Sequence, residues 1–546
     1  MIISKVNDGQ SIYKSWRENG EKKYEIVPFK PYFYVKEDAT EPSIYKPSKY
    51  ISRDFEYIRG NWVNIDSEPL KKVCVDSSFD IRKAKDMFSK TYEADVPFHF
   101  RYCVDELDEM PEYDMRKWYW DMEWQQGGEH HDKITTIVVY DNYDKEYYQW
   151  LWLPNYIQME DDEFIFNNEK DMIESFMRTM IVKDPDMLIA WFGHFADIPK
   201  LLERACAVGL NPCIMSPIGF VKGIKKAGEG FEFKYIEKGF TPIEQPIGGR
   251  ICLSLDLAFE RQWNDSQRGT LPSMSLDYIG EMVLNKKKLV SEKFPDTNEF
   301  YRRAWLEDTQ TYLEYAIKDV ELIVEIDEKN FCSEAILSLQ RLLKAPFDAC
   351  FYASHMGSIY FMRNAWWKAP TGTKVDKRET YEGAMIYDPL SEGTNGLHLN
   401  VAAFDFAGLY PSMMIARNIS FETKSTEPTE FGVNILTPRD FSETKDVKML
   451  YYKTDELGLL PKAVLELKEL RNEYKRLMRE ARETDNGEYA KWYNNQMAVK
   501  RLMASFYGIV AFQGFGWADV NLAASITASA REAIRLAAFK AKEMKE

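Results

Sequence analysis

The spacing of apolar residues changes along the chain and predicts several structural regions. Up to about residue 115, short strand-like runs such as KKYEIVPF, PYFYVKE and YIRGNWVNI are separated by polar and proline-containing turns, which is typical of a small β-rich domain. Three further strands, WYWDMEW, KITTIVVYD and YYQWLWLP, are followed by a helix over 171–182 and the strand DMLIAWFG. Strands that alternate with helices predict an α/β domain, which ends with a helix over 308–329.

Helical periodicity dominates the second half of the chain. It covers residues 333–367, after which LHLNVAAFDF predicts an apolar strand that ends at Asp405. Two helices over 462–483 and 489–506 are separated by TDNGE, whose Asn-Gly pair favours a tight connection, so we expect an antiparallel helical hairpin. The final stretch, SITASAREAIRLAAFKAKEMKE, predicts an amphipathic helix.

Length and composition limit the class of protein. A chain of 546 residues is expected to form about three to five domains. The N-terminus lacks the basic and apolar regions of a signal peptide, and no apolar run reaches the length of a membrane span, so we expect a protein that stays inside the cell. The seven cysteines include no C-x-x-C pair, which favours reduced, mostly buried thiols over a zinc or redox site.

The charge is unevenly distributed along the chain. A net charge of −16 disfavours nucleic-acid binding by the chain as a whole, because phosphate contacts require Lys and Arg. Residues 451–507, however, contain eleven Lys or Arg against nine Asp or Glu, and the basic residues gather over 468–482. The average charge therefore does not exclude a basic patch on the predicted hairpin.

Acidic residues form the first candidate site. Asp121 and Glu123 lie two apart on a predicted strand, so both side chains point to one face and could share a metal ion; solvated acids at a strand end are the alternative. Asp197 lies at a predicted helix start, where capping is the alternative role. Tyr315 and Asp319 are four apart and project from one helical face; the alternative for Asp319 is a salt-bridged surface residue.

A second candidate site begins at Asp405. It is followed by FAGLYPS, whose Gly and Pro predict a turn, with a helix that starts near Pro411 or Ser412. Backbone N–H groups at such a turn can bind a phosphate chain, although an acidic cap on an ordinary loop would look the same.

The predicted hairpin adds basic and aromatic residues to this second site. On its second helix, four residues share one stripe that could line a nucleotide site: Gln496, Lys500, Ala504 and Tyr507. On its first helix, Arg471 and Lys475 are four apart and supply positive charge suited to a triphosphate. A solvated helix face is the alternative for this pair.

Taken in order, the segments around Asp121, Asp197 and Asp319 resemble the Exo I, Exo II and Exo III motifs of the DnaQ-type 3'-5' proofreading exonuclease of family B DNA polymerases. The resemblance implies that these three acids and Glu123 hold two divalent ions, and that Tyr315 positions the attacking water. One ion would generate hydroxide and the other would stabilise the leaving oxygen of the DNA 3' end.

The second of these motifs departs from the family pattern. The family usually shows Y-N-x-x-x-F-D, whereas this chain has Trp191, Phe192 and Ala196 before Asp197. The metal-binding acid is retained. The family's Asn and Phe help to bind the primer terminus. The resemblance therefore supports hydrolysis more firmly than it supports this mode of substrate binding.

The second half of the chain resembles the polymerase part of the same family. YEGA, DFAGLYPS, R-x-x-x-K and QMAVKRLMASFYG follow the order of the motifs Y-x-G-G, D-x-x-S-L-Y-P-S, R-x-x-x-K and K-x-x-x-N-S-x-Y-G, so the resemblance covers essentially the whole chain. It implies that Asp405, with the adjacent Phe406, binds the catalytic metals and that Tyr410 is the steric gate against a ribose 2'-hydroxyl. The remaining roles that it implies are triphosphate binding by the backbone of Gly408 and Leu409, phosphate binding by Arg471, Lys475 and Lys500, and packing near the nascent base pair by Tyr507 and Gly508.

Three positions depart from these polymerase motifs. Ala384 replaces the second Gly of Y-x-G-G, Gly408 replaces the motif Ser, and Ala504 replaces the motif Asn. None of these changes removes a metal ligand. The loss of the Asn side chain affects a contact near the base pair rather than the class of reaction.

The predicted fold is multidomain, with α/β and α+β parts. It comprises a β-rich N-terminal domain over 1–115 with a helical return over 324–372, an RNase H-like exonuclease domain over 116–323, a partial palm over 373–450 and 508–546, and helical-hairpin fingers over 451–507. The names of these domains follow from the resemblance.

The resemblance implies a template-directed DNA polymerase with a 3'-5' proofreading exonuclease, two Mg²⁺ or Mn²⁺ ions in each active site, and primer-template DNA and dNTP as ligands. After Gly508, no acid lies in a Y-x-D-T-D string. We therefore expect a split polymerase, in which a second polypeptide supplies the remaining catalytic aspartates and the thumb. A sliding clamp is a further expected partner, and the expected location is the cytoplasm, at a nucleoid or viral replication site.

Other hypotheses remain open from the sequence. One is a stand-alone 3'-5' exonuclease whose polymerase-derived half serves as a DNA-binding platform; others are a catalytically silent replication scaffold and an artificial truncation. In addition, FKPYFYV and ADVPFHFRY resemble the archaeal branch of the family, in which this region reads template uracil. A packed β core explains the same residues.

Overall fold

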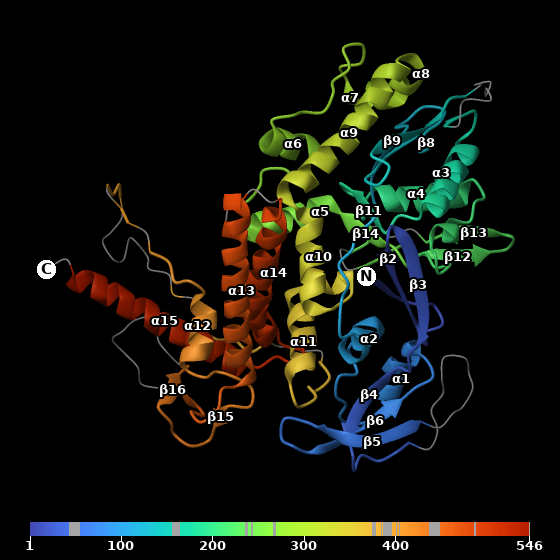
Figure 1. Ribbon diagram of the computed structural model, residues 1–546. Helices are drawn as coiled ribbons and strands as arrows, with labels where there is room; N and C mark the ends of the chain where they lie inside the picture. Colours follow the sequence, from blue (N-terminus) through green and yellow to red (C-terminus); the bar gives the residue numbers. More distant parts are fainter. Residues whose placement is uncertain are drawn as a thin grey trace. The chain divides into compact units, whose positions relative to one another are not determined.

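The computed structural model divides the chain into two compact units (Figure 1). The first consists of Met1–Phe29 and Phe98–Phe351, and the second of Lys30–Pro97 and Tyr352–Glu546. The structure describes residues 1–42, 55–154, 164–234, 239–241, 244–265, 269–373, 378–383, 385, 396–399, 401–402, 404–435, 448–484 and 487–544.

Residues 1–115 contribute to both units. The chain leaves the first unit after Phe29 and returns to it at Phe98, so the stretch between these residues belongs to the second unit. The domain boundaries expected from the sequence cut the chain at other places and stay predictions.

The first unit contains a large mixed sheet, a small antiparallel sheet and a two-stranded ribbon. The large sheet has the strand order β10-β9-β8-β7-β11-β14, and the small one has the order β1-β2-β3. The strands of this unit are β1 Ile2–Lys5, β2 Ser11–Glu18, β3 Glu21–Pro28, β7 Lys117–Trp124, β8 Ile134–Asp141, β9 Glu146–Trp152, β10 Ile165–Phe166, β11 Met187–Ala190, β12 Ile224–Ala227, β13 Gly230–Phe233 and β14 Ile251–Ser254.

Helices cover both faces of the large sheet. The helices of the first unit are α2 Phe98–Glu106, α3 Glu169–Lys183, α4 Asp197–Ala207, α5 Leu255–Asp265, α6 Leu276–Leu284, α7 Thr297–Glu299, α8 Trp305–Glu307, α9 Thr309–Asn330 and α10 Cys332–Leu343. A π-helical turn over Phe300–Ala304 joins α7 to α8. The expected α/β alternation and the closing helix, here α9, are confirmed.

Strand β7 lies inside the sheet and separates two different surfaces. It pairs antiparallel with β8 and parallel with β11, so its backbone is held on both sides. Trp118 and Trp120 are buried in the core with Phe176 of α3. Successive strand residues point to opposite faces, and Tyr119 accordingly reaches the other side, where its hydroxyl donates to Asp327 of α9 at 2.7 Å. Residues of β7 with odd numbers therefore face α9.

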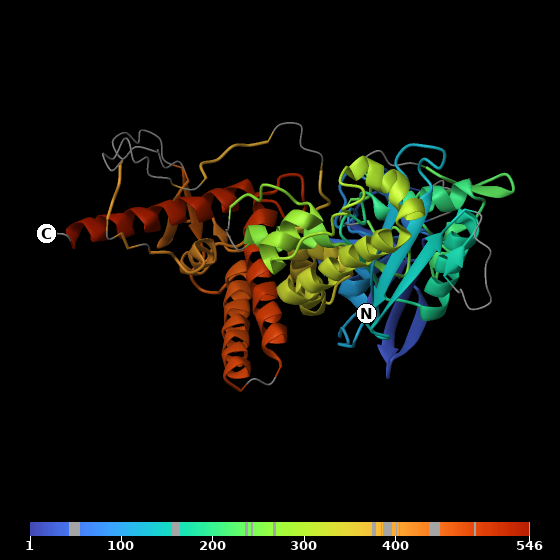
Figure 2. The same cartoon turned by 90° about the horizontal axis from the view of Figure 1, so that it is seen from above.

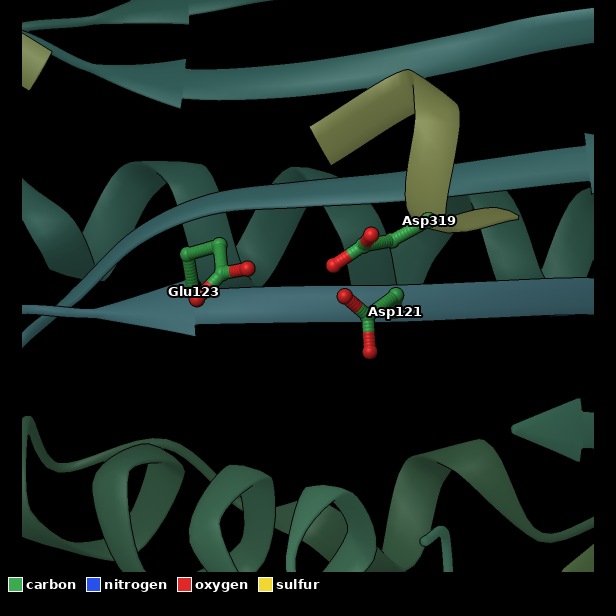
Figure 3. Close-up of side chains that lie close together, drawn as sticks. All are labelled: Asp121, Glu123 and Asp319. Carbon is green, nitrogen blue, oxygen red and sulfur yellow. The ribbon is translucent and has the colours of Figure 1, made fainter. Parts of the chain in front are cut away.

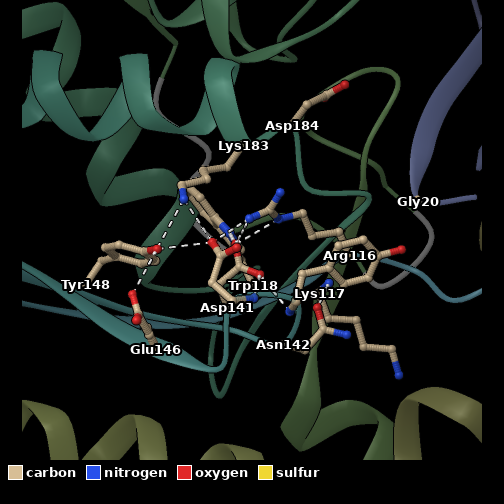
Figure 4. A network of polar contacts seen from close by, with 12 residues as sticks. Gly20, Arg116, Lys117, Trp118, Asp141, Asn142, Glu146, Tyr148, Lys183 and Asp184 are labelled. Atoms are coloured by element: carbon tan, nitrogen blue, oxygen red, sulfur yellow. Dashed lines mark hydrogen bonds and ion pairs between the residues drawn. The ribbon is translucent and has the colours of Figure 1, made fainter.

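A polar network holds the beginning of β7 (Figure 4). The guanidinium of Arg116 contacts Asp141 at 2.8 Å and Asp144 at 2.5 Å, and the indole N–H of Trp118 donates to Asp141 at 2.7 Å. Lys183, at the end of α3, also donates to Asp144. Because Asp141 is fully buried, these donors and the backbone N–H of Tyr143 replace the water that it loses on folding. The network fixes the strand three residues before Asp121.

The described residues of the second unit form two small antiparallel sheets and a group of long helices. The sheets have the orders β4-β6-β5 and β15-β17-β16. Its strands are β4 Tyr32–Lys36, β5 Glu56–Val63, β6 Pro69–Cys74, β15 Lys424–Ser425, β16 Phe431–Asn434 and β17 Met449–Tyr452. Its helices are α1 Ile81–Lys85, α11 Ala353–Asn364, α12 Leu409–Ala416, α13 Leu459–Thr484, α14 Tyr489–Ala511 and α15 Val520–Glu543.

The expected helical hairpin is present as α13 and α14, which run side by side in both views (Figures 1 and 2). Both helices extend a few residues beyond the predicted limits. Within the expected turn, Asp485 and Asn486 lie outside the described residues. None of the described helices combines the length and the apolar character that a transmembrane helix requires.

The apolar strand expected over 397–406 is not formed by the described residues of this segment, so that prediction is wrong. Leu397 and Phe404 are 91% and 95% exposed, although both are strongly apolar. A strand is stable only when a neighbouring strand satisfies its backbone groups and its apolar face is covered. The sequence of this segment has a β-type pattern, but its described residues meet neither condition.

The segments that suggested uracil reading are largely buried. Phe33 and Val35 of β4 belong to the core of the β4-β6-β5 sheet, and Phe100 and Tyr102 of α2 are buried within the first unit. Packing accounts for these residues. Uracil reading stays a prediction.

Candidate active sites

Two acids of β7 project toward α9. Asp121 and Glu123 are odd-numbered residues of the strand, and its pairing with β8 places them opposite Val138 and Thr136. The even-numbered Trp120 and Met122 fill the core on the other face. The alternation that buries the aromatic residues therefore also presents the two carboxylates together.

A third acid joins them from α9. Asp319 lies on this helix and is 1% exposed, and Figure 3 shows its carboxylate beside those of Asp121 and Glu123. One ligand oxygen from each of the three lies within 4.8 Å of the others. The alternative of a salt-bridged surface residue is wrong for Asp319, because the side chain is buried.

Asp197 is the fourth acid of this site, although it lies outside the group of three. It is the first residue of α4, and Ala196 occupies the capping position before it. The side chain of Asp197 is 4% exposed and raises the pKa of both Asp121 and Glu123 by its charge. A helix cap is thus not its role.

The four acids line one cavity of about 720 Å³ in the first unit. Its walls also contain aromatic and apolar side chains, namely Trp124, Trp191, Phe192, Leu276, Leu289, Val290, Phe294, Phe300, Tyr301 and Tyr315. A cavity of this size is large enough for a nucleotide, and it combines apolar walls with a few convergent charged groups. The sequence prediction that these four acids come together is consistent with this arrangement.

The surroundings make it costly for all four carboxylates to be ionised. Burial is the main cause for Glu123, and repulsion from Asp319 and Asp197 adds to it, so that the pKa of Glu123 is raised to about 8. Burial also raises the pKa of Asp197 to about 7, with added repulsion from Asp256. The pKa of Asp121 is raised well above its usual range, for the same two reasons. Such a group of acids requires nearby positive charge in order to ionise at neutral pH.

Lys288 supplies positive charge at this site and was missed by the sequence analysis. Its ammonium contacts Asp319 Oδ2 at 2.5 Å and donates to the Tyr315 hydroxyl at 3.1 Å. Burial would lower the pKa of Lys288, but the carboxylates of Asp319, Asp121 and Glu123 outweigh it and raise the pKa above its usual value. Its only sequence signal was a run of three lysines, which resembles a solvated surface.

Tyr315 lies where the sequence predicted it, one helical turn from Asp319. Besides the bond from Lys288, its hydroxyl shares a hydrogen bond of 2.8 Å with the hydroxyl of Tyr301. Tyr301 lies in the π-helical turn, where no sequence pattern had selected it. Burial raises the pKa of Tyr301 to about 12, so this hydroxyl stays protonated at neutral pH.

The donor set of this cavity fits divalent metal ions. Three carboxylates offer hard oxygen ligands within 4.8 Å of one another, and Mg²⁺ and Mn²⁺ prefer such ligands. The buried Oδ1 atom of Asp319 has no hydrogen-bond partner among the described residues, so it is available to a ligand. An ion of charge +2 would also relieve the repulsion between the acids.

The candidate site of the second unit is less enclosed. Asp405 and Phe406 are exposed and precede α12 without forming a strand. Helix α12 begins at Leu409, slightly before the predicted start, and Gly408 precedes it with a φ of +74°, a conformation that glycine adopts without strain. Gly408, Leu409 and Tyr410 therefore form the predicted turn and helix start.

Tyr410 packs against the second helix of the hairpin. Its ring centroid lies 4.6 Å from that of Tyr507, and the hydroxyl of Tyr507 shares a hydrogen bond of 3.0 Å with Tyr381. The adjacent Gly508 is also part of α14. Residues from the Y-x-G-G, D-x-x-S-L-Y-P-S and K-x-x-x-N-S-x-Y-G segments thus meet, while Ala384 lies outside the described residues.

The basic residues of the hairpin lie close to one another. Arg471 donates from Nε to Gln496 of α14 at 3.3 Å. Burial lowers the pKa of Lys475, and the charges of Arg471 and Lys500 lower it further. Ala504, the fourth position of the predicted stripe, is exposed. Three cations from two helices face the same region, which is the arrangement that a phosphate chain requires.

The fold and these sites define a class of enzyme in which a nuclease domain with clustered acids is joined to the helical hairpin and nucleotide-binding segments of a polymerase. Residues 119–253 match the exonuclease domain of DNA polymerase family B, and residues 358–545 match DNA polymerase family B. Together the two matches span more than half of the chain. The chain belongs to DNA polymerase family B.

Individual relatives agree with this assignment. The chain is 26% identical to a DNA polymerase of Pyrococcus glycovorans, over 99% of this chain and 68% of that protein, and 27% identical to one of Thermococcus sp. (strain 9oN-7), over 95% and 65%. The DNA polymerase delta catalytic subunit of Candida albicans is 26% identical over 68% of this chain and 35% of its own length. The chain thus spans about two thirds of the length of the two archaeal relatives.

A solved structure shares the fold. The family B DNA polymerase of the hyperthermophilic archaeon Pyrobaculum calidifontis superimposes with a TM-score of 0.72, at 18% sequence identity, over 99% of this chain and 71% of that one. The predicted fold class is confirmed by this likeness and by the exonuclease match.

Proposed function

We propose that the first unit removes nucleotides from DNA 3' ends by metal-dependent hydrolysis and that the second unit selects deoxynucleotides for template-directed synthesis. The observation that carries the nuclease proposal is the cavity in which Asp121, Glu123, Asp197 and Asp319 converge around Lys288. The family assignment favours DNA as the substrate of both units.

In the proposed hydrolysis, the oxygen of a water molecule bonds to phosphorus and the bond from phosphorus to the 3' oxygen of the preceding nucleotide breaks. That oxygen takes up a proton, and the products are a nucleoside 5'-monophosphate and a shortened strand. Two bound Mg²⁺ or Mn²⁺ ions would supply Lewis acidity for attack and departure. The proposed ligands of these ions are Asp121, Glu123, Asp197 and Asp319.

The residues of the chain itself would bind and orient the substrate. Lys288 is placed to offset negative charge on the scissile phosphate, since its ammonium already lies among the acids. The Tyr315 hydroxyl, which accepts a hydrogen bond from Lys288, keeps its own proton for the attacking water or a phosphate oxygen. Apolar walls reduce competing water around these groups.

The nuclease proposal is tested with a 5'-labelled single-stranded oligonucleotide in Mg²⁺. The wild-type chain should shorten it stepwise, and Asp121→Ala should lose this activity by at least about 100-fold. Glu146→Ala, on strand β9 of the same sheet and exposed, is a control for the loss of a surface acid. Activity that Asp121→Ala retains would show that the acids of the cavity are not responsible, and wild-type inactivity would contradict the proposal.

The polymerase proposal is carried by the contact of Tyr410 with Tyr507 and by the three basic residues of the hairpin, Arg471, Lys475 and Lys500. Asp405 and Phe406 are the proposed metal-binding residues of this unit, Gly408 and Leu409 would hold the triphosphate through their backbone, and Gly508 would lie near the base pair. These features favour a nucleotide site over a mere DNA-binding platform.

Polymerisation requires carboxylates in addition to Asp405, and no Y-x-D-T-D string occurs within these 546 residues. We propose that another segment supplies them, with the expected second polypeptide as one source and a longer form of this chain as the other. Primer extension by this chain alone, and after addition of the candidate polypeptide, distinguishes the two. The sliding clamp and the site of DNA replication in the cell stay proposals that follow from the polymerase function.

A further inference from the structure

The exonuclease cavity contains a second tyrosine whose position depends on an irregular helical turn. Tyr301 lies in the π-helical turn Phe300–Ala304, between α7 and α8, and lines the cavity together with the four acids. A π turn accommodates an extra residue and occurs frequently at functional sites. Here the neighbouring Phe300 packs its ring 5.0 Å from that of Tyr315, and Tyr301 packs 6.1 Å from the same ring. Two consecutive residues of the turn therefore contact one tyrosine of α9.

The Tyr315 hydroxyl is the centre of a short chain of hydrogen bonds. Lys288 Nζ lies 3.1 Å from its oxygen and can only donate to it. The Tyr301 hydroxyl lies 2.8 Å from the same oxygen. A tyrosine hydroxyl has one proton to donate, so the direction of the bond with Tyr301 decides where the Tyr315 proton points.

Which of the two hydroxyls donates matters because Tyr315 can donate its one proton to only one acceptor. If Tyr315 donated to Tyr301, its single proton would be engaged by that hydroxyl and would not reach a bound water or phosphate. If Tyr301 donates instead, Lys288 and Tyr301 together occupy the accepting side of the Tyr315 oxygen. The Tyr315 proton is then free for the water or the phosphate at the centre of the cavity.

We propose that Tyr301 is a positioning residue of the exonuclease, whose hydroxyl donates to Tyr315 and thereby directs the Tyr315 proton toward the reacting groups. This inference rests on the proposed nuclease function. Tyr301 acts through Tyr315 and not on the substrate. The role requires the hydroxyl of Tyr301, whereas its ring would serve packing alone.

The substitution Tyr301→Phe removes the hydroxyl and keeps the ring. With a 5'-labelled single-stranded oligonucleotide in Mg²⁺, we expect kcat to fall about 3- to 10-fold, the effect of one hydrogen bond, with KM unchanged within about 2-fold. Tyr315→Phe should cost more. Because Tyr301 acts through Tyr315, the double variant should be no slower than Tyr315→Phe alone.

Tyr119→Phe is the matched control, because the Tyr119 hydroxyl also joins another element to α9, through Asp327, but does not line the cavity. It should lower thermal stability and leave kcat unchanged. Thermal denaturation of all variants identifies any loss of fold.

The outcomes separate the inference from the function on which it rests. An unchanged kcat in Tyr301→Phe, a raised KM at constant kcat, or effects of the two tyrosines that multiply in the double variant would each overturn the positioning role. If the wild-type chain fails to hydrolyse DNA, or if Asp121→Ala remains active, the proposed function itself fails.

Discussion

Lys288 Nζ lies 2.5 Å from Asp319 Oδ2, so a cation from the segment after α6 contacts a buried acid of α9. Two lysines line this cavity, and Lys288 is the one that contacts an acid of the cluster, whereas Lys287 pairs with Glu281. The pair of Lys288 and Asp319 also fixes Tyr315, whose hydroxyl accepts a hydrogen bond from the same ammonium. One lysine thus links the electrostatics of the cavity to the position of the hydroxyl that is proposed to act in hydrolysis.

Replacing Lys288 with Met keeps much of the side-chain volume and removes the charge. We expect exonuclease kcat to fall at least about 10-fold, because a charge directed at the phosphate is lost. The rate of shortening of a 5'-labelled single strand measures this effect. Lys286→Met, which removes a nearby lysine that pairs with Glu325 instead and does not line the cavity, should change the rate by less than about 2-fold. Equal effects of the two variants would contradict the specific role of Lys288.

The raised pKa values of the acids predict a pH-dependent stability. Burial is the main cause for Glu123, whose pKa rises from 4.5 to about 8, so the folded protein retains a proton that the unfolded chain releases between these values. Raising the pH across this window therefore destabilises the metal-free protein. Glu123→Gln removes this effect. Denaturation in a chelator should show equal stability of the two proteins near pH 4 and a more stable variant near pH 8, by at least about 1 kcal/mol.

Mg²⁺ should oppose the loss of stability that the wild-type protein shows at pH 8. Mg²⁺ binds the ionised acids and so stabilises the folded wild-type protein at pH 8, whereas Glu123→Gln, with one ligand fewer, should gain less. Urea denaturation with and without Mg²⁺ compares the two. A metal effect of the same size in both proteins would show that Glu123 is not a ligand.

Phe192 is expected to bind the terminal base in place of the residues that the family uses. It lines the cavity and is 38% exposed, while the position of the family's Phe is occupied by Ala196. Stacking of a base on an aromatic ring is worth about 1–3 kcal/mol. Phe192→Ala should therefore raise KM about 5- to 100-fold for a normal 3' terminus, with kcat little changed.

Two comparisons check that prediction. Phe195→Ala removes a somewhat more exposed ring from the same loop. This ring does not line the cavity, so the substitution should leave KM unchanged. A substrate whose terminal nucleotide lacks a base should be hydrolysed with the same KM by the wild type and by Phe192→Ala. A persistent difference on that substrate would argue against stacking.

Tyr410 is expected to discriminate against ribonucleotides. Its ring is held 4.6 Å from the ring of Tyr507, so it cannot easily yield to a 2'-hydroxyl. Tyr410→Ala should reduce the preference for dTTP over UTP about 10-fold, whereas Tyr410→Phe, which keeps the ring, should retain it. Equilibrium dialysis with labelled nucleotides measures both affinities. An unchanged preference in Tyr410→Ala would exclude this tyrosine as the gate.

Local patterns predicted much of the exonuclease part. Alternation in WYWDMEW placed Asp121 and Glu123 on one face, and helical spacing placed Tyr315 beside Asp319, because both relationships depend only on the geometry of a single element. The helical hairpin was predicted for the same reason. The local pattern gave a wrong prediction where an element depends on a neighbouring strand. The apolar residues of 397–406 form no strand in the part of that segment that the structure describes.

The sequence by itself determined the acids, their motifs and the regular elements that carry them. Only the tertiary structure decided that Lys288 and Tyr301 belong to the same cavity, because a lysine run and a π-helical turn have no periodic pattern and acquire their positions from packing against α9. The electrostatics of the site also depend on the tertiary structure. The sequence gives the number of acids, but the shifts in their pKa arise from burial and from the distances between elements that are far apart along the chain.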